Sequence, residues 1–137
     1  MKCVKCLVIC CLSLLLVSCG VNIDEDLAHG VMKKIYDARK KGSFHKEFKL
    51  YDKESFKIVP FNDVAITLKA VVGGAGRFKK ASHVSTKIER RNQIREGLVS
   101  YMVLTYNVEY SRFSLSESYY FLGSSEKPII VYMTLQF

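Results

Sequence analysis

The apolar residues of this chain change their spacing once, and that change limits the folds that the chain can adopt. Before Gly73-Gly74-Ala75-Gly76 they recur every three or four residues, as on one face of a helix, and after it they alternate. Helices followed by strands in hairpin succession are typical of an α+β fold. We therefore predict N-terminal helices packed on a curved, antiparallel sheet of about four strands, in a single domain over residues 25–137.

Two helices are predicted before residue 60. The first runs from Glu25 to Lys41, because Asp24 can accept hydrogen bonds at its N-terminus and Gly42 suits the residue after its last turn. The second is short and begins after Ser43. Its apolar side chains form one aromatic stripe, which consists of Phe44, Phe48 and Tyr51.

A third helix is predicted over Val64 to Val72. Asn62 or Asp63 would cap it, and with Asn62 as the cap Phe61 could pack against Ile66 in the first turn. The glycine-rich sequence at 73–76 is expected to end this helix, since glycine is the usual residue just after a helix C-terminus.

Four strands are predicted in the second half, beginning with Ala81 to Arg91. From Ser100, alternate residues form one apolar face, which consists of Met102, Leu104, Tyr106, Val108 and Tyr110. A third strand follows the turn at Ser111-Arg112. The expected buried face of the last strand consists of Ile129, Val131, Met133, Leu135 and Phe137. Antiparallel strands that bury one face alternate in this way.

The first residues have the organisation of an export signal. Lys2 and Lys5 precede an apolar run from Cys6 to Val17, which is shorter than the roughly 20 residues that span a bilayer. A charged start, a short apolar middle and a small-residue cleavage site are typical of a secretory signal peptide. We therefore predict a signal peptide over residues 1–18.

The end of this segment, Leu16-Val17-Ser18-Cys19, resembles the lipobox of bacterial lipoproteins. The resemblance implies cleavage before Cys19, acyl chains on Cys19, and a short tether over residues 19–24. Two or three acyl chains hold a protein firmly on a membrane, because each buried methylene contributes about 0.8 kcal/mol. The resemblance thus implies an exported protein anchored in the bacterial envelope, and Gly20 in place of an aspartate favours the outer membrane.

Composition narrows the classes of partner. Loss of Lys2 and Lys5 with the signal peptide leaves 19 positive and 13 negative side chains, a net charge of +6. This balance suits an anionic membrane surface, lipopolysaccharide or an acidic protein, although solvated faces would also explain it. Export argues against a nucleic-acid partner. Cys19 is the only cysteine after the signal peptide, so packing rather than a disulfide is expected to hold the domain together.

Most of the remaining chain resembles the nuclear transport factor 2-like group, whose cone-shaped architecture is shared with cystatin-like folds. More narrowly, it is similar to small bacterial lipoproteins with uncharacterised domains of this type. The segments that carry the resemblance are Lys40-Lys41-Gly42, Tyr51 to Phe56, Val71 to Lys80, Leu104 to Tyr110 and Ser116-Glu117. The resemblance implies a curved sheet that encloses an interior cavity with the helices. Relatives often have a tryptophan in the last strand, where this chain has Val131 and Tyr132.

Some enzymes of this group place an acid and a tyrosine inside the cone. The candidates for such a cavity here are Tyr106, Glu109, Glu117 and Tyr119. A buried glutamate beside tyrosine hydroxyls could act as a general acid or base. The favoured alternative is that the tyrosines are core aromatics and that both glutamates face solvent and pair with Arg91 or Arg112.

No metal or cofactor is expected from the motifs. His29, His45 and His83 lie far apart in different predicted elements, whereas zinc sites usually contain at least one close pair of ligands. The glycines at 73–76 lack the Lys-Ser/Thr that completes a phosphate-binding loop. No serine stands in a nucleophile elbow.

The leading hypothesis is a non-enzymatic, membrane-anchored binding or accessory module that holds a small apolar ligand or a partner protein. Two alternatives stay open. One is an immunity or exclusion lipoprotein that acts against a toxin or a phage, and the other is a small acid/base enzyme that uses Glu109 or Glu117. The burial of these two glutamates bears on the last alternative, because an enzyme needs one of them in an open pocket beside a tyrosine hydroxyl.

Overall fold

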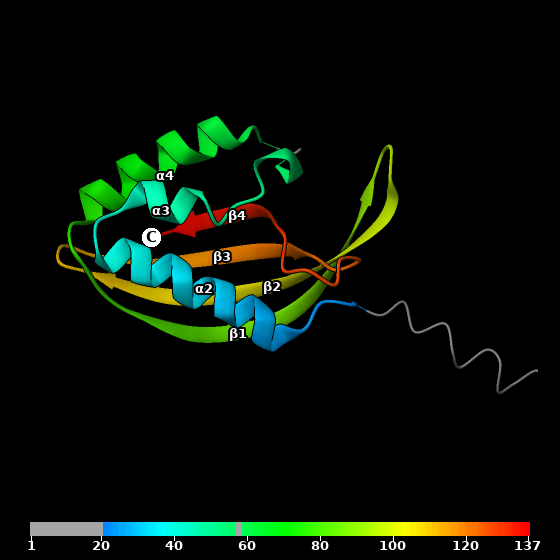
Figure 1. Cartoon of the computed structure of the whole chain (residues 1–137), viewed down its shortest axis with the longest axis horizontal. Helices are drawn as coiled ribbons and strands as arrows, with labels where there is room; N and C mark the ends of the chain where they lie inside the picture. The colour runs from blue at the N-terminus through cyan, green and yellow to red at the C-terminus, as the bar shows by residue number, and fades with distance from the viewer. Residues whose placement is uncertain (1–20, 57–58) are drawn as a thin grey trace, which may run out of the picture.

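The computed structural model describes residues 21–56 and 59–137. The predicted signal peptide and the lipobox with Cys19 lie outside the described residues. Within the described residues, three α-helices precede four strands, which form one antiparallel sheet in the order β1-β2-β3-β4 (Figure 1). The predicted α+β fold, with helices packed on a curved sheet, is confirmed. In the described part of the chain, no helix is both long enough and apolar enough to cross a bilayer.

The first helix begins and ends close to the predicted positions, whereas the second begins after Ser43 as predicted but ends before Tyr51, the last residue of its predicted aromatic stripe. Helix α2 spans Glu25–Lys40, and the Oδ1 atom of Asp24 accepts a hydrogen bond from the amide of Asp26 at 2.8 Å. Gly42 follows with φ of 66°, a left-handed conformation that glycine adopts without strain. Helix α3 spans Phe44–Phe48 and is capped by the Ser43 hydroxyl. A short 3-10 helix, η2, covers Lys53–Ser55.

Helix α4 spans Phe61–Ala75 and begins earlier than predicted. It starts directly after Pro60, and no side chain caps its N-terminus, so the expected caps at Asn62 and Asp63 are wrong. The expected contact between Phe61 and Ile66 is wrong as well. Phe61 is buried in the core, whereas 67% of Ile66 is exposed.

The C-terminal end of α4 also lies beyond the predicted position. Gly73 and Gly74 continue the helix, and Gly76, with φ of 93°, ends it. A glycine inside a helix costs about 1 kcal/mol relative to alanine. Burial of Val72 and Ala75 in the core offsets part of that cost.

The strands pair as consecutive hairpins and are longer than predicted at the start of the sheet. Their bounds are Phe78–Gln93 for β1, Gly97–Tyr110 for β2, Ser114–Leu122 for β3 and Ile130–Gln136 for β4. The predicted apolar face of β2 is confirmed, because all five of its residues are buried in the main core.

The predicted buried face of β4 is wrong in part. The register between β3 and β4 shifts at Tyr120/Phe121, and a shift of this kind interrupts the alternation of faces. Ile130 and Met133 therefore lie in the main core, whereas Val131 packs in a separate cluster with Tyr120. Phe137 is 89% exposed.

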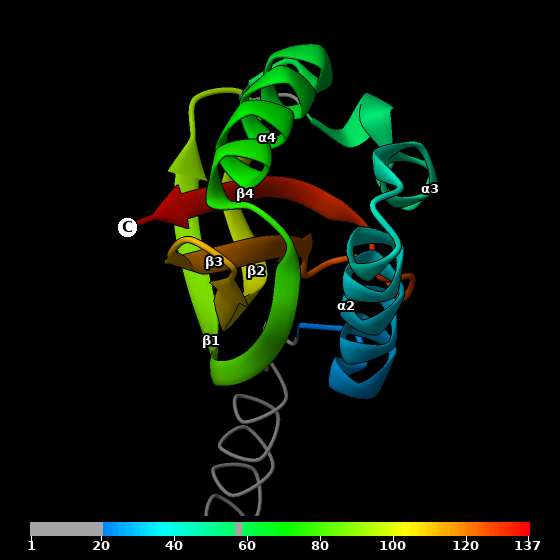
Figure 2. The same cartoon turned by 90° about the vertical axis from the view of Figure 1, so that its left-hand side faces the viewer.

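The sheet curves around the helices. Helices α2 and α3 lie on its inner side, and α4 lies along β4, as both views show (Figures 1 and 2). The main core fills the space between these helices and the inner face of the sheet. The second apolar cluster consists of Tyr101, Val103, Tyr120 and Val131.

The described part of the predicted tether is attached to the domain. Ile23 is buried in the main core, and the amide of Asn22 donates a hydrogen bond to the carbonyl oxygen of Gly123 at 2.7 Å. The fold therefore begins before residue 25.

Candidate functional site

An ion network joins α2, α3 and β3 inside the core. Its charged members are Arg39, Glu47 and Glu117, and their side chains are at most 2% exposed. Arg39 lies seven residues after Met32 and four after Ile35, which places its side chain on the buried stripe of α2. The helix period thus directs a guanidinium into the core.

Arg39 binds both carboxylates. Its Nη2 and Nε atoms donate to Glu47 at 2.5 and 3.2 Å, and its Nη1 atom lies 2.7 Å from each carboxylate oxygen of Glu117. Burial acts to lower the pKa of Arg39, but Tyr119 and the two carboxylates outweigh it, so its pKa is raised. The guanidinium therefore stays charged.

Four tyrosine hydroxyls complete the network. Tyr36, Tyr110 and Tyr119 donate to Glu117 at 3.3, 2.8 and 2.8 Å. Tyr51 donates to Glu47 at 3.1 Å. Burial raises the pKa of all four tyrosines, so each remains a protonated donor. The network has two carboxylates and only one guanidinium, and the hydroxyl donors help to stabilise the extra negative charge.

The structure corrects the expectation that Glu117 faces solvent. Glu117 is 0% exposed and pairs with Arg39, not with Arg91 or Arg112. Glu109 is half-buried and does not share the face of Glu117, because the even-numbered side chains of β2 face the core. Its partner in the register is Lys80 of β1.

The four cavity candidates therefore separate. Glu117 and Tyr119 contact each other in the ion network. Tyr106 lies on the same face of the sheet but bonds to His29. Glu109 lies on the other face.

The charged side chains of the network are shielded from solvent. In the described part of the chain, no buried polar side-chain atom lacks a hydrogen-bond partner. A pocket of about 270 Å³ near the end of α2 is lined by Arg39 but by neither Glu47 nor Glu117. A general acid or base must reach the proton that it transfers. The geometry therefore supports a structural role for Glu117.

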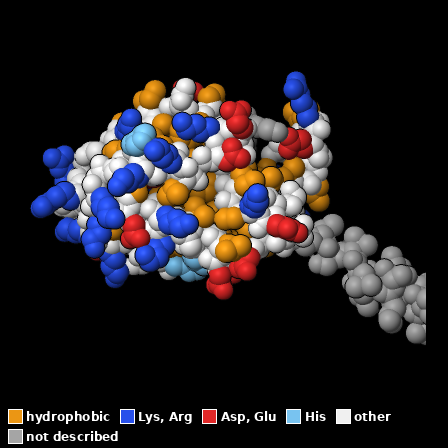
Figure 3. Space-filling view, in the orientation of Figure 1, with side chains coloured by type: hydrophobic (Ala, Val, Ile, Leu, Met, Phe, Trp, Pro, Cys, Tyr) orange, Lys and Arg blue, Asp and Glu red, His pale blue; other side chains and the backbone are white. Residues whose placement is uncertain are grey.

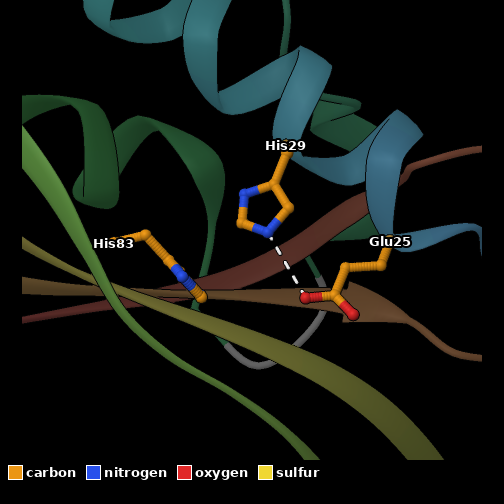
Figure 4. A group of neighbouring side chains, drawn as sticks. All are labelled: Glu25, His29 and His83. Carbon is orange, nitrogen blue, oxygen red and sulfur yellow. Dashed lines mark hydrogen bonds and ion pairs between the residues drawn. The ribbon is translucent and has the colours of Figure 1, made fainter.

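A second cluster lies where α2 meets β1. Glu25 and His29 are four residues apart, and therefore share a face of α2, opposite His83 of β1 (Figure 4). One nitrogen or oxygen atom from each of the three lies within 4.8 Å of the other two. The His29 Nε2 atom is 3.3 Å from Glu25 Oε1. The fold thus brings together two of the three histidines that are distant in sequence.

Each member of this histidine cluster has a hydrogen-bond partner. The Nδ1 atom of His29 lies 2.5 Å from the hydroxyl of Tyr106. The hydroxyl of Thr86 donates to Glu25 Oε1 at 2.6 Å and lies 3.0 Å from His83 Nε2. The bond from Thr86 lowers the pKa of Glu25, so its carboxylate stays ionised. Burial raises the pKa of Tyr106 to about 12, so its hydroxyl stays protonated.

A groove of about 590 Å³ runs between α4 and β4. Among the described strands, β4 pairs with β3 alone, so it lies at the edge of the sheet. The side chains from the helical side of the groove are Val59, Asp63, Val64, Thr67, Leu68 and Val71, and those from the strand side are residues 132–137. The groove therefore combines an apolar wall with the edge strand of a sheet.

Charge is distributed unevenly over the surface. Lys and Arg side chains gather at the end of the molecule where α2 finishes and β1 begins, and more of the Asp and Glu lie toward the other end (Figure 3). The exposed residues of these segments include Lys40, Lys41, Arg77, Lys79 and Lys80. This basic end suits an acidic partner.

Comparisons with protein families, with curated proteins and with solved structures found no match to the chain. The assignment of a function therefore rests on the chemistry of the ion network, the histidine cluster and the groove.

Proposed function

We propose that this protein is a lipoprotein of the bacterial envelope, anchored by acyl chains on Cys19, and that it acts as a binding module and not as an enzyme. Its ligand is an extended, apolar segment of another envelope protein. The observation that supports this proposal is the position of β4 at the edge of the sheet, beside the groove that it forms with α4.

The edge of β4 supplies the main-chain part of the recognition. An edge strand presents backbone N–H and C=O groups that can pair with an added strand. Peptide-binding domains use such edges for affinity and use adjoining pockets to select side chains. The antiparallel sheet would then gain a fifth strand beyond β4.

The groove supplies the side-chain part. Its volume of about 590 Å³ falls in the range of small-ligand pockets. Val64, Leu68 and Val71 make its helical wall apolar. Because side chains of an extended strand alternate, every second residue of the ligand would enter the groove. A ligand with alternating apolar residues therefore fits this site.

The basic end adds a preference for the residues that flank the ligand. The groove is bordered by Val71 near the end of α4, and Arg77 follows soon after in the chain. Exposed cations there favour acidic residues beside the apolar segment. The immunity and exclusion alternatives fit this surface too, with a segment of an incoming toxin or phage protein as the ligand.

The enzyme alternative loses support from the burial of Glu117. Its carboxylate is surrounded by Arg39 and three tyrosine hydroxyls, and it does not line the pocket near the end of α2 that Arg39 borders. The network instead joins α2 and α3 to the sheet.

A peptide selection with matched variants tests the proposal. A displayed library of random 12-residue peptides is selected against the full chain in detergent. We expect the enriched peptides to alternate apolar residues and to carry acidic flanks. Thr67 lines the groove and Ala70 does not, although both are exposed on α4. Thr67→Glu should therefore abolish binding, whereas Ala70→Glu should leave it unchanged.

Hydrogen exchange of the bound complex locates the peptide. Binding by strand addition should slow exchange of backbone amides in β4 more than in β1, the opposite edge of the sheet. Peptides that bind Thr67→Glu as well as the native chain, or that protect only β1, would contradict the proposal.

A further inference from the structure

We infer that Glu25, His29 and His83 form a binding site for Zn²⁺. The inference is independent of the proposed peptide groove, because none of the three residues lines it. It rests on the types of the three ligand atoms, on the backbone geometry that brings them together and on the hydrogen bonds that these side chains make to Tyr106 and Thr86.

The donor set matches zinc in type and spacing. Two imidazoles and one carboxylate, with a position left for water, are a known arrangement of zinc ligands. Tetrahedral zinc with bonds of about 2.0–2.1 Å separates its ligand atoms by about 3.4 Å. His29 Nε2 and Glu25 Oε1 are already 3.3 Å apart. The widest separation of ligand atoms is at most 4.8 Å, so it must shorten by no more than about 1.4 Å to reach that geometry.

The side chains have the freedom and the solvent access for this adjustment. The side chain of Glu25 is 49% exposed and that of His29 is 31% exposed. Small rotations of exposed side chains can close the gap without repacking the core. An ion can enter from solvent, and a water molecule can take the fourth position.

A β-bulge in β1 places His83 and Thr86 beside Glu25 and His29. The register of β1 against β2 shifts between His83 and Ser85, so that His83 faces Tyr106 and Thr86 faces Leu104. Residues three apart lie on opposite faces of a regular strand. The bulge instead places His83 and Thr86 on the same face, toward α2. Bulges occur preferentially where a strand must redirect a side chain at a functional site.

Outer hydrogen bonds hold the ligands as zinc sites require. A histidine ligand usually donates its other ring N–H to a nearby group, and this fixes the nitrogen that binds the metal. Tyr106 is placed to accept from Nδ1 of His29, which would leave Nε2 for the ion. The Thr86 hydroxyl donates its proton to Glu25, so its oxygen accepts a hydrogen bond from Nε2–H of His83. The unprotonated Nδ1 of His83 is then the atom that binds zinc.

A neutral His29 can bind zinc by a change of tautomer, in which the ring proton moves from Nε2 to Nδ1. Without the ion, Tyr106 can donate to Nδ1, and Nε2–H can donate to Glu25. With the ion on Nε2, the ring proton sits on Nδ1 and Tyr106 becomes the acceptor. Imidazole ligands favour zinc, copper and nickel, whereas calcium and magnesium prefer oxygen ligands throughout. The site should therefore discriminate against Ca²⁺ and Mg²⁺.

Calorimetric titration of the full chain with ZnCl₂ tests the inference. The chain is purified in detergent without a histidine tag. We expect the native chain to bind one more Zn²⁺ per molecule, with a saturable isotherm, than His29→Ala or His83→Ala does. Thr86→Val should weaken binding by about 10–100-fold, as removal of outer hydrogen bonds to zinc ligands does. His45→Ala is the matched control, since His45 is exposed on α3 outside the cluster.

A spectroscopic titration separates this site from the cysteines. The substitutions leave all cysteines of the chain unchanged, whether or not the segment before Cys19 is removed, so cysteine ligands cannot explain a difference between the variants. Co²⁺ in the native chain should give a visible absorption that His83→Ala lacks, without the thiolate band that cysteine ligands produce. MgCl₂ should give no comparable heat.

Either of two results would overturn the inference. One is equal Zn²⁺ affinity in the native chain and in both histidine variants. The other is no Zn²⁺ binding tighter than about 1 mM in a native chain whose circular dichroism shows it folded.

Discussion

Replacing Arg39 with methionine should destabilise the domain more than any other single change in charge. Methionine resembles the length of the arginine stem but supplies none of the donors. Arg39 makes six hydrogen bonds to Glu47, Glu117, Tyr110 and Tyr119. Their loss leaves two buried carboxylates without a cation.

The magnitude follows from that buried charge. Removing one partner of a buried ion pair costs about 3–5 kcal/mol, and here one cation serves two carboxylates. We expect a loss of about 4–5 kcal/mol in the free energy of unfolding, against a total of about 5–15 kcal/mol for a typical domain. At about 3–5 °C per kcal/mol for a domain of this size, the melting temperature should fall by roughly 12–25 °C.

Urea denaturation followed by circular dichroism measures the effect. Lys33→Met on the exposed face of α2 is the control, because the Lys33–Asp37 pair is solvated and solvated ion pairs contribute little to stability. The triple variant Arg39→Met, Glu47→Gln, Glu117→Gln removes the stranded charges together with the cation. It should recover part of the lost stability, since uncharged replacements of buried ion pairs are often tolerated.

The response to pH provides a further check on the reasoning. A buried carboxylate without a cation is more stable when protonated. The deficit of Arg39→Met should therefore be smaller at about pH 5 than at about pH 8. A deficit below about 1 kcal/mol at about pH 8 would refute the argument, because Arg39 would then not neutralise the buried carboxylates.

Three further predictions address other parts of the molecule. Burial raises the pKa of Tyr106 from 10 to about 12, so its contribution to stability is complete below pH 10 and is lost as the pH rises toward 12. In urea titrations, Tyr106→Phe should therefore lose less stability than the native chain between about pH 9 and about pH 11. Gly76→Ala should lower the free energy of unfolding by about 2 kcal/mol, because φ is 93° and the new Cβ would overlap Ser111 Oγ. Gly30→Ala, in open space within α2, should raise it by up to about 1 kcal/mol in the same assay. Intact mass of the protein from its host's membranes should show a chain that starts at Cys19 with two or three acyl chains, and this species should be absent for Cys19→Ala; a full-length, unmodified native chain would contradict the anchor.

The local features of the fold could be predicted from the sequence because they depend on neighbouring residues. Asp24 and Gly42 fix the ends of α2 through hydrogen bonds and backbone conformation within a few residues. The apolar face of β2 follows from alternation alone. The position of Glu117 was also readable, since it shares the parity of Leu115 and Phe121, which are buried on the same face.

The ion network was missed because a charged residue was assumed to face solvent. Arg39 falls on the apolar stripe of α2 by spacing, and Glu47 falls on the aromatic stripe of α3 three residues after Phe44. Spacing could therefore have indicated that both side chains are buried. It could not have indicated that they meet Glu117, because that contact depends on how α2 and α3 pack on the sheet.

The remaining differences between the predicted and the observed faces of the strands are caused by β-bulges. Nothing in the residues around His83 or Tyr120 marks a register shift, yet each shift reverses the faces of the residues beyond it. The first shift brings Thr86 beside His83 and so creates the histidine cluster. The second places Val131 in the outer cluster, against the simple alternation of the last strand.

The docking of residues 21–23 links the proposed anchor to the proposed groove. Cys19 precedes Val21 by two residues, so at most about 7 Å of chain separates the acylated residue from a segment that packs against Gly123. The described chain begins and finishes toward opposite ends of the long axis (Figure 1), and residues 134–137 line the groove. The groove would then open away from the membrane, where a partner segment can reach it. Cys19→Ala should consequently release the protein from the membrane and leave its peptide affinity in solution unchanged.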